Sequence, residues 1–192
     1  MSRQGFSEAL NWATAAATAI ANNATEQLLV PNQTIFANYL ADGRVLRWRA
    51  MGGYGTTATP TLTFSVRWGG LAGTVLAKSF AATTTSAVGG GASMTAYWEA
   101  EILIQTRLNG SSGSLFTGGN FTLYTSTAPA AGTVTNYGLV VPIVSGSTGG
   151  TTPAAVTVDL TADTQLSFTV TWSAANAANS IQTQFALTES LN

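Results

Sequence analysis

The sequence predicts an all-β fold, an antiparallel β-sandwich of the jelly-roll kind with a short N-terminal arm. Apolar and polar side chains alternate over most of the chain with a period of two, which is typical of strands that have one face on a core. Gly- and Ser-rich turns separate these runs at short, regular intervals, as in sandwiches and jelly rolls. Helical spacing is found only near the N-terminus.

Strands are expected at residues 14–21, 26–30, 44–52, 61–68, 74–80, 97–107, 115–124, 137–144, 155–160 with 165–173, and 180–190. In the first half of the chain the clearest run is 61–68, where every second residue from Leu62 is apolar. In the second half, 97–107, 165–173 and 180–190 alternate in the same way. The alternation places four tryptophans in the inward rows: Trp48, Trp68, Trp98 and Trp172.

Turn signals delimit these runs. Asp42-Gly43 precedes the strand at 44–52 and is a candidate two-residue hairpin. Gly69-Gly70 ends the run at 61–68, and Gly/Ser-rich loops are expected at residues 88–91, 109–113 and 145–152. No linker divides the chain, so residues 13–192 are expected to form a single jelly-roll domain.

Residues 1–12 are assigned to the N-terminal arm. Over 6–18 a helix capped by Ser7 fits the spacing, and an Ala/Thr alternation from Ala13 fits a strand equally well. Phe6, Leu10 and Trp12 have no obvious place in the sandwich. We therefore expect these three side chains to pack on another subunit.

Composition excludes several kinds of chemistry. The 192 residues contain no Cys and no His, so disulfides, thiolate or imidazole metal sites and Ser-His-Asp or Cys-His catalysis are excluded. Only 8% of residues are charged and the net charge is −1, which gives no general attraction to nucleic acid or acidic membranes. No cofactor, nucleic-acid partner or membrane partner is expected.

The few charges still offer two candidate sites. Glu99 and Glu101 point to the same face of one strand, whereas a glycosidase pair usually comes from separate elements that flank a cleft. Arg47, Arg49 and Arg67 are expected on outward positions, as a small cationic stripe across two strands. These arginines and glutamates could pair within the sheet or across a subunit boundary, and the sequence leaves both alternatives open.

Five segments together resemble a known family. They read Leu-Arg-Trp-Arg-Ala at 46–50, Thr-Pro-Thr-Leu-Thr-Phe at 59–64, Trp-Glu-Ala-Glu at 98–101, Leu-Ser-Phe-Thr-Val-Thr-Trp at 166–172, and Ile-Gln-Thr-Gln-Phe at 181–185. With these five segments in this order, the chain resembles a jelly-roll module of tailed-bacteriophage virion proteins over residues 14–190. Ile35-Phe36-Ala37 stands where that module has Ile-Pro-Ala.

The resemblance implies a virion structural protein that is not an enzyme. From this resemblance we first expect the chain to be a capsid decoration, or cement, protein that binds and stabilises the outer shell of the phage head. Such a protein would form a homo-oligomer, commonly a trimer, and contact the major capsid protein or other virion subunits. The alternative is a structural or receptor-binding module of a tail, baseplate or fibre. A glycoside-acting enzyme or carbohydrate-binding module would share the fold.

Overall fold

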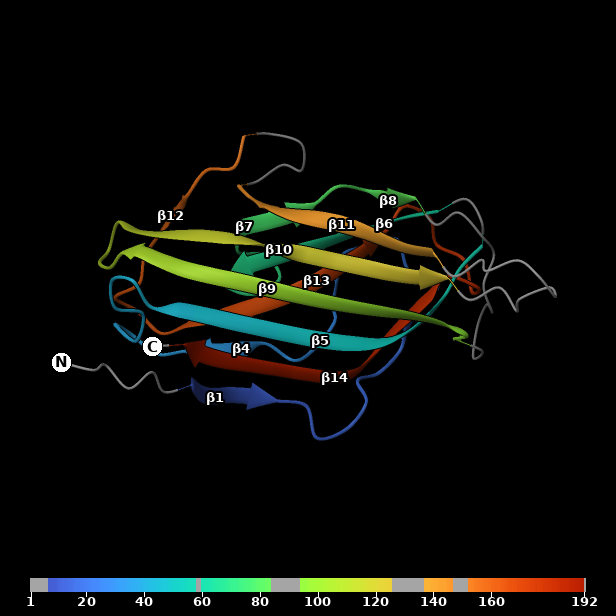
Figure 1. Cartoon of the computed structure of the whole chain (residues 1–192), viewed down its shortest axis with the longest axis horizontal. Helices are drawn as coiled ribbons and strands as arrows, with labels where there is room; N and C mark the ends of the chain where they lie inside the picture. Colours follow the sequence, from blue (N-terminus) through green and yellow to red (C-terminus); the bar gives the residue numbers. More distant parts are fainter. Residues whose placement is uncertain (1–6, 58–59, 84–93, 126–136, 147–151, 192) are drawn as a thin grey trace.

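The computed structural model describes residues 7–57, 60–83, 94–125, 137–146 and 152–191 (Figure 1). These residues form only strands and connections, in the order β1 (Ser7–Trp12), β2 (Ile20–Ala21), β3 (Gln27–Leu28), β4 (Gln33–Ile35), β5 (Val45–Gly55), β6 (Thr61–Trp68), β7 (Thr74–Ser79), β8 (Ala82–Thr83), β9 (Ala96–Leu108), β10 (Gly113–Thr125), β11 (Tyr137–Ser145), β12 (Val156–Val158), β13 (Thr164–Trp172) and β14 (Ser180–Leu191). The predicted all-β class is therefore confirmed.

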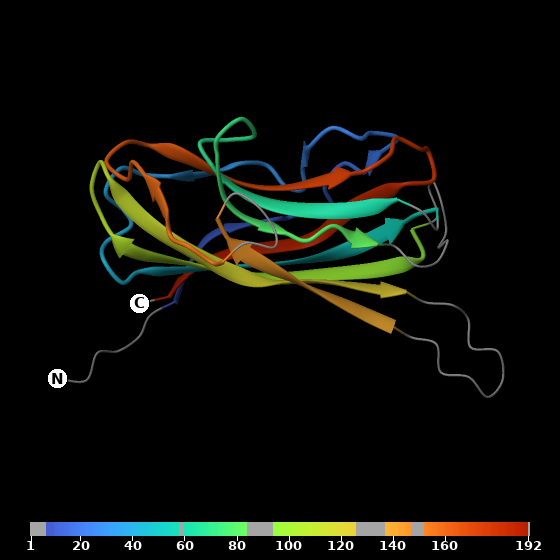
Figure 2. The same cartoon turned by 90° about the horizontal axis from the view of Figure 1, so that it is seen from above.

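The strands lie in two facing layers (Figure 2). The larger layer has the strand order β1-β14-β5-β9-β10-β11, and the smaller layer has the order β7-β6-β13 with β3 and β4 along its far edge. One antiparallel pairing, Ile143 to Ser79 and its neighbours, joins β11 to β7, so the sheet folds over on itself at that side. The predicted antiparallel sandwich is confirmed in this arrangement.

The strand order does not confirm the jelly-roll connectivity. A jelly roll is built from two Greek keys. Here β9, β10 and β11 follow one another as paired neighbours within the larger layer, and β6 and β7 do the same within the smaller layer. The period-two pattern predicts which side of a strand is buried, but it does not predict which strands pair.

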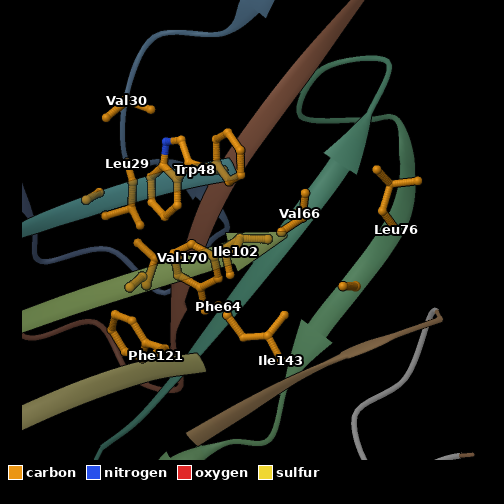
Figure 3. Close-up of a cluster of buried hydrophobic side chains, with 14 of the residues drawn as sticks. Leu29, Val30, Trp48, Phe64, Val66, Leu76, Ile102, Phe121, Ile143 and Val170 are labelled. Atoms are coloured by element: carbon orange, nitrogen blue, oxygen red, sulfur yellow. The ribbon is translucent and has the colours of Figure 1, made fainter. Parts of the chain in front are cut away.

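Aromatic side chains join the two layers across the core (Figure 3). Trp48 on β5 stacks on Phe168 of β13, with ring centroids 4.0 Å apart and an interplanar angle of 8°. Contacts of 5.7, 5.3 and 5.6 Å continue from Trp48 to Phe64 on β6, then to Phe121 on β10 and Trp98 on β9. All four tryptophans expected in the inward rows are buried.

Three local expectations need correction. The strand expected over 14–21 forms only at its end, as β2 (Ile20–Ala21). Asp42-Gly43 does form a turn, with Gly43 at φ 82°, but it does not close a hairpin. The strand before it, β4, pairs with β13, whereas β5 pairs with β14 and β9. Residues 7–12, where a helix was one option, form the strand β1, because their backbone pairs with β14 at the open side of the larger layer.

A bulge in β14 places its backbone against a glycine of β5. The register shifts between Thr183 and Phe185, opposite Gly52. The carbonyl oxygen of Gln182 accepts a hydrogen bond from Trp98 Nε1 at 3.1 Å, and a Cβ at Gly52 would lie 1.9 Å from that oxygen. Gly52 therefore leaves room for the carbonyl that binds the buried Trp98 indole.

We expect Gly52→Ala to destabilise the protein by about 2–3 kcal/mol, because the methyl group overpacks the bulge and displaces the Gln182 carbonyl. The melting temperature should fall by about 5–10 °C in a calorimetric scan. Gly118→Ala is the matched control, since a Cβ there would meet nothing within 4 Å. Its stability should change by less than about 1 kcal/mol, and an equal loss in both variants would contradict the proposed role of Gly52.

Candidate functional site

The outward-pointing side chains of the larger layer form the strongest candidate site. We call this surface the outer face, and it spans β14, β5, β9, β10 and β11. Its exposed large apolar side chains are Tyr97, Leu103, Tyr124, Val140 and Phe185, which are 37–60% exposed. Exposed large apolar side chains gathered on one face are typical of interaction sites on soluble domains.

Leu103 lies in the middle of the outer face. It belongs to the central strand β9, where its register partners are Arg47 on β5 and Gly118 on β10. Gly118 has no side chain and a Cβ there would meet open space, so one side of Leu103 is uncovered. Leu103 is 44% exposed although it is flanked along its strand by buried Ile102 and Ile104.

Tyr97 and Tyr124 are brought together at one end of the outer face. They are direct register partners on β9 and β10, with ring centroids 5.8 Å apart. The Tyr97 hydroxyl donates to Met51 Sδ at 2.8 Å, and the Tyr124 hydroxyl donates to Glu99 Oε1 at 2.6 Å. Alternation within each strand does not indicate this contact, because it depends on the register between β9 and β10.

The carboxylate Glu99 also raises the pKa of both tyrosines. For Tyr124 the hydrogen bond to Glu99 is the main cause, followed by burial and the nearby negative charge. For Tyr97 burial contributes most and the charge of Glu99 adds to it. Both phenols are therefore neutral donors at physiological pH.

Four of the charged candidates, Arg47, Arg49, Glu99 and Glu101, lie on the outer face, and both arginines have an acidic partner there. Arg47 donates to Glu189 Oε2 at 2.6 Å, and Arg49 Nε lies 3.8 Å from Glu101 Oε2. Arg49, Glu99 and Glu101 line a depression of about 110 Å³ with Met51 and Asn120. Each of the two candidate carboxylates already has a partner within the chain, and both come from the single strand β9.

Arg67 does not extend a cationic stripe from Arg47 and Arg49, because it lies on β6 in the other layer. Its guanidinium donates two hydrogen bonds to the Glu26 carboxylate, at 2.7 and 2.6 Å, and one to the Gly73 carbonyl oxygen at 2.8 Å. The Thr169 hydroxyl on β13 donates a further short hydrogen bond to Glu26. This cluster attaches the chain before β3 to the smaller layer.

Glu26 is held ionised by these contacts. Burial alone would raise the pKa of its carboxyl, but the hydrogen bonds from Arg67 and Thr169 and the positive charges of Arg67 and Lys78 outweigh it. The net result is a lowered pKa for Glu26. The same pairing raises the pKa of the Arg67 guanidinium, chiefly through its hydrogen bond to Glu26.

The three apolar candidates of the N-terminal arm differ in where the structure places them. Leu10 is partly buried against the core of its own chain, so it does have a place in the sandwich. Trp12 is 59% exposed at the end of β1. Phe6 lies outside the described residues. Packing of Trp12 and Phe6 on another subunit stays a prediction.

Two further acidic side chains, Asp159 and Asp163, accept hydrogen bonds from neighbouring segments. Asp159 accepts hydrogen bonds from the backbone N–H and hydroxyl of Thr161, and Asp163 accepts one from the Ala37 N–H, so both stabilise connections. The described ranges contain no group of three or more acidic side chains placed to hold a metal ion. Nor does any helix there have the length and hydropathy to cross a membrane. Comparison with protein-family models, curated proteins and solved structures gave no match to this chain.

Glu26→Gln should lower the free energy of unfolding by about 1.5 kcal/mol at pH 7, since it removes hydrogen bonds to a charged group that is 22% exposed. Because the folded-state pKa is below the ordinary value of 4.5, this contribution is complete above pH 4.5 and is lost as the pH falls through the folded-state pKa. Denaturant unfolding at pH 7 and pH 3 measures the difference.

Glu101→Gln is the control for that measurement, because its side chain is 48% exposed and its ion pair with Arg49 is long. Its effect at pH 7 should stay within about 0.5 kcal/mol. Two results would contradict this role of the ionised Glu26 carboxylate. One is an equal loss of stability in the two variants, and the other is an effect of Glu26→Gln that is the same at both pH values.

Proposed function

We propose that this chain is a non-enzymatic structural protein of a tailed-bacteriophage virion, most specifically a capsid decoration protein. In this proposal the chain binds the outer surface of the phage head as a homotrimer and stabilises the shell. The family comes from the resemblance of the five sequence segments. The observation that carries the structural role is the outer face, where large apolar side chains are exposed and Arg47 and Arg49 are paired with glutamates of the same chain.

The chemistry of the outer face supports packing against another protein. Interfaces are enriched in aromatic residues, and the outer face carries Tyr97 and Tyr124 together with the ion pairs Arg47–Glu189 and Arg49–Glu101. Because Arg47 and Arg49 already have acidic partners, covering them buries paired charges instead of isolated ones. Leu103 has the central position that anchor residues of interfaces occupy.

The low total charge supports the same proposal. A free-standing domain usually carries more charge to remain soluble. Here 8% of residues are charged, and three ion pairs engage Arg47, Arg49 and Arg67. A protein that covers much of its surface in an assembly needs fewer charges. The chain also contains no Cys, so its stability comes from packing.

Leu103→Lys should weaken self-association at least about tenfold, because it places an unpaired charge in the centre of the proposed interface. Sedimentation velocity over a range of concentrations measures the effect, and circular dichroism checks the fold. Phe36→Lys is the matched control. It introduces the same charge at a side chain that is 66% exposed and lies away from the outer face.

Two results would overturn the proposal. One is a wild-type protein that sediments as a monomer and does not bind heads assembled without it. The other is an equal effect of Leu103→Lys and Phe36→Lys on association. Labelled electron microscopy of particles supplies the location: label on the tail would favour the tail, baseplate or fibre alternative.

A further inference from the structure

The first part of β11 leaves one edge of the larger layer open. Residues 137–142 pair with β10 on one side, and pairing with β7 on the other side begins only at Ile143. Figure 2 shows the beginning of β11, in orange, directed away from the smaller layer. Among the described residues, no other strand pairs with this part of β11. An unpaired edge strand is a template for a further strand.

The register identifies which backbone groups point out of this open edge. Gly146 donates its N–H to the Leu76 carbonyl oxygen of β7 at 2.9 Å, so the even-numbered residues of β11 face the β7 side. Pro142 fits this direction, because it has no N–H to give to β10. Hydrogen bonding alternates along an antiparallel strand. The N–H and C=O groups of Gly138 and Val140 therefore point away from β10, where β7 does not pair with them.

Over residues 138–140 the open edge has little protection against pairing. Charged side chains, lysine above all, often block edge strands, but residues 137–146 contain none. Leu139 and Val140 are instead apolar and 40% and 60% exposed. Pro142 ends the edge, since a proline cannot donate a hydrogen bond to an added strand. The edge thus offers two complete residues, Gly138 and Val140, on either side of Leu139.

This short edge is complementary to itself. If a two-fold axis lies at Leu139, Val140 of each copy is opposite Gly138 of the other, and Leu139 is opposite Leu139. Each Val140–Gly138 pair then exchanges two hydrogen bonds, so the two pairs make four. Gly138 has no side chain beside the exposed Val140, and the two Leu139 side chains meet on one face of the joined sheet. An isologous contact of this kind closes at two chains.

We propose that β11 pairs antiparallel with β11 of a second copy of this chain, centred on Leu139. The larger layers of the two copies then form one continuous sheet. Four backbone hydrogen bonds and one apolar contact give only weak association, so the test traps the contact covalently. The contact uses backbone groups at the edge and does not involve Leu103, so it is separate from association through the outer face.

A single cysteine at the centre of the edge traps the pairing. The chain has no Cys, so Leu139→Cys introduces its only thiol. In the proposed pairing the two Cα atoms at position 139 are about 4.5 Å apart, as in a non-hydrogen-bonded pair, and a disulfide can bridge that distance. Oxidation of the full chain with copper–phenanthroline should give a covalent dimer on non-reducing gel electrophoresis.

Val140→Cys is the matched control, because it lies one residue away and its side chain is the more exposed of the two. In the same pairing, position 140 is diagonal to position 140 of the second copy. Their Cα atoms are about 7–8 Å apart, which is too far for a disulfide. We expect at least about fivefold less dimer from Val140→Cys than from Leu139→Cys.

Val140→Pro, added to Leu139→Cys, tests the hydrogen bonds. It removes the outward N–H, and with it two of the four bonds between copies, but it removes no bond to β10. Circular dichroism checks that the fold is retained, and the crosslinked fraction should fall at least about tenfold. Val140→Ala keeps the N–H and should change the crosslinked fraction by less than about twofold.

The proposal is overturned if Leu139→Cys crosslinks no better than Val140→Cys, or if Val140→Pro leaves the crosslinked fraction unchanged. Leu103→Lys keeps the open edge, so crosslinking through Leu139→Cys should persist in that background. Loss of the crosslink there would assign the contact to the outer face and would also overturn the edge pairing. A chain that crosslinks but does not bind phage heads would contradict only the proposed function.

Discussion

The contact between Trp48 and Phe168 is the constraint on which the rest of this structure depends. It is the closest of the aromatic contacts, 4.0 Å between centroids, and it joins the middle of the larger layer to the smaller one. Rings packed this closely fix the separation of the layers and the rotation of β5 relative to β13. Both rings are only 1% exposed, so the contact lies wholly within the core.

The period of two explains how far the sequence could predict this fold. Burial of Trp48, Trp68, Trp98 and Trp172 follows from alternation alone, because each side chain's face is fixed by its position along the strand. Strand pairing is not fixed in this way. The predicted hairpin at Asp42-Gly43 was wrong because β4 pairs with β13, more than 120 residues away along the chain. The residues around Asp42 contain no pattern that indicates this distant pairing.

The candidate site was predictable only in part, for the same reason. Alternation placed Arg47, Arg49, Glu99 and Glu101 on outward rows, and the structure puts all four on the outer face. Whether they pair depends on which strands are neighbours, so the partner of Arg47 is Glu189 on β14 and that of Arg67 is Glu26 before β3. The Tyr97–Tyr124 contact likewise depends on the register between β9 and β10, which alternation within each strand does not determine.

The edges of the sheet indicate how such a protein would associate. Long, regular edge strands invite pairing between chains, but the edges at β1 and at β3 and β4 are blunted. On one side β1 has six residues, a register shift between Ala9 and Asn11, and a charged Glu8; on the other, β3 and β4 have two and three residues. Extended backbone pairing with a second copy is thus disfavoured at β1 and at β3 and β4. The outer face has no such protection, since Leu103 stands uncovered at its centre. The architecture therefore favours association through side chains of the outer face over backbone pairing at β1, β3 or β4.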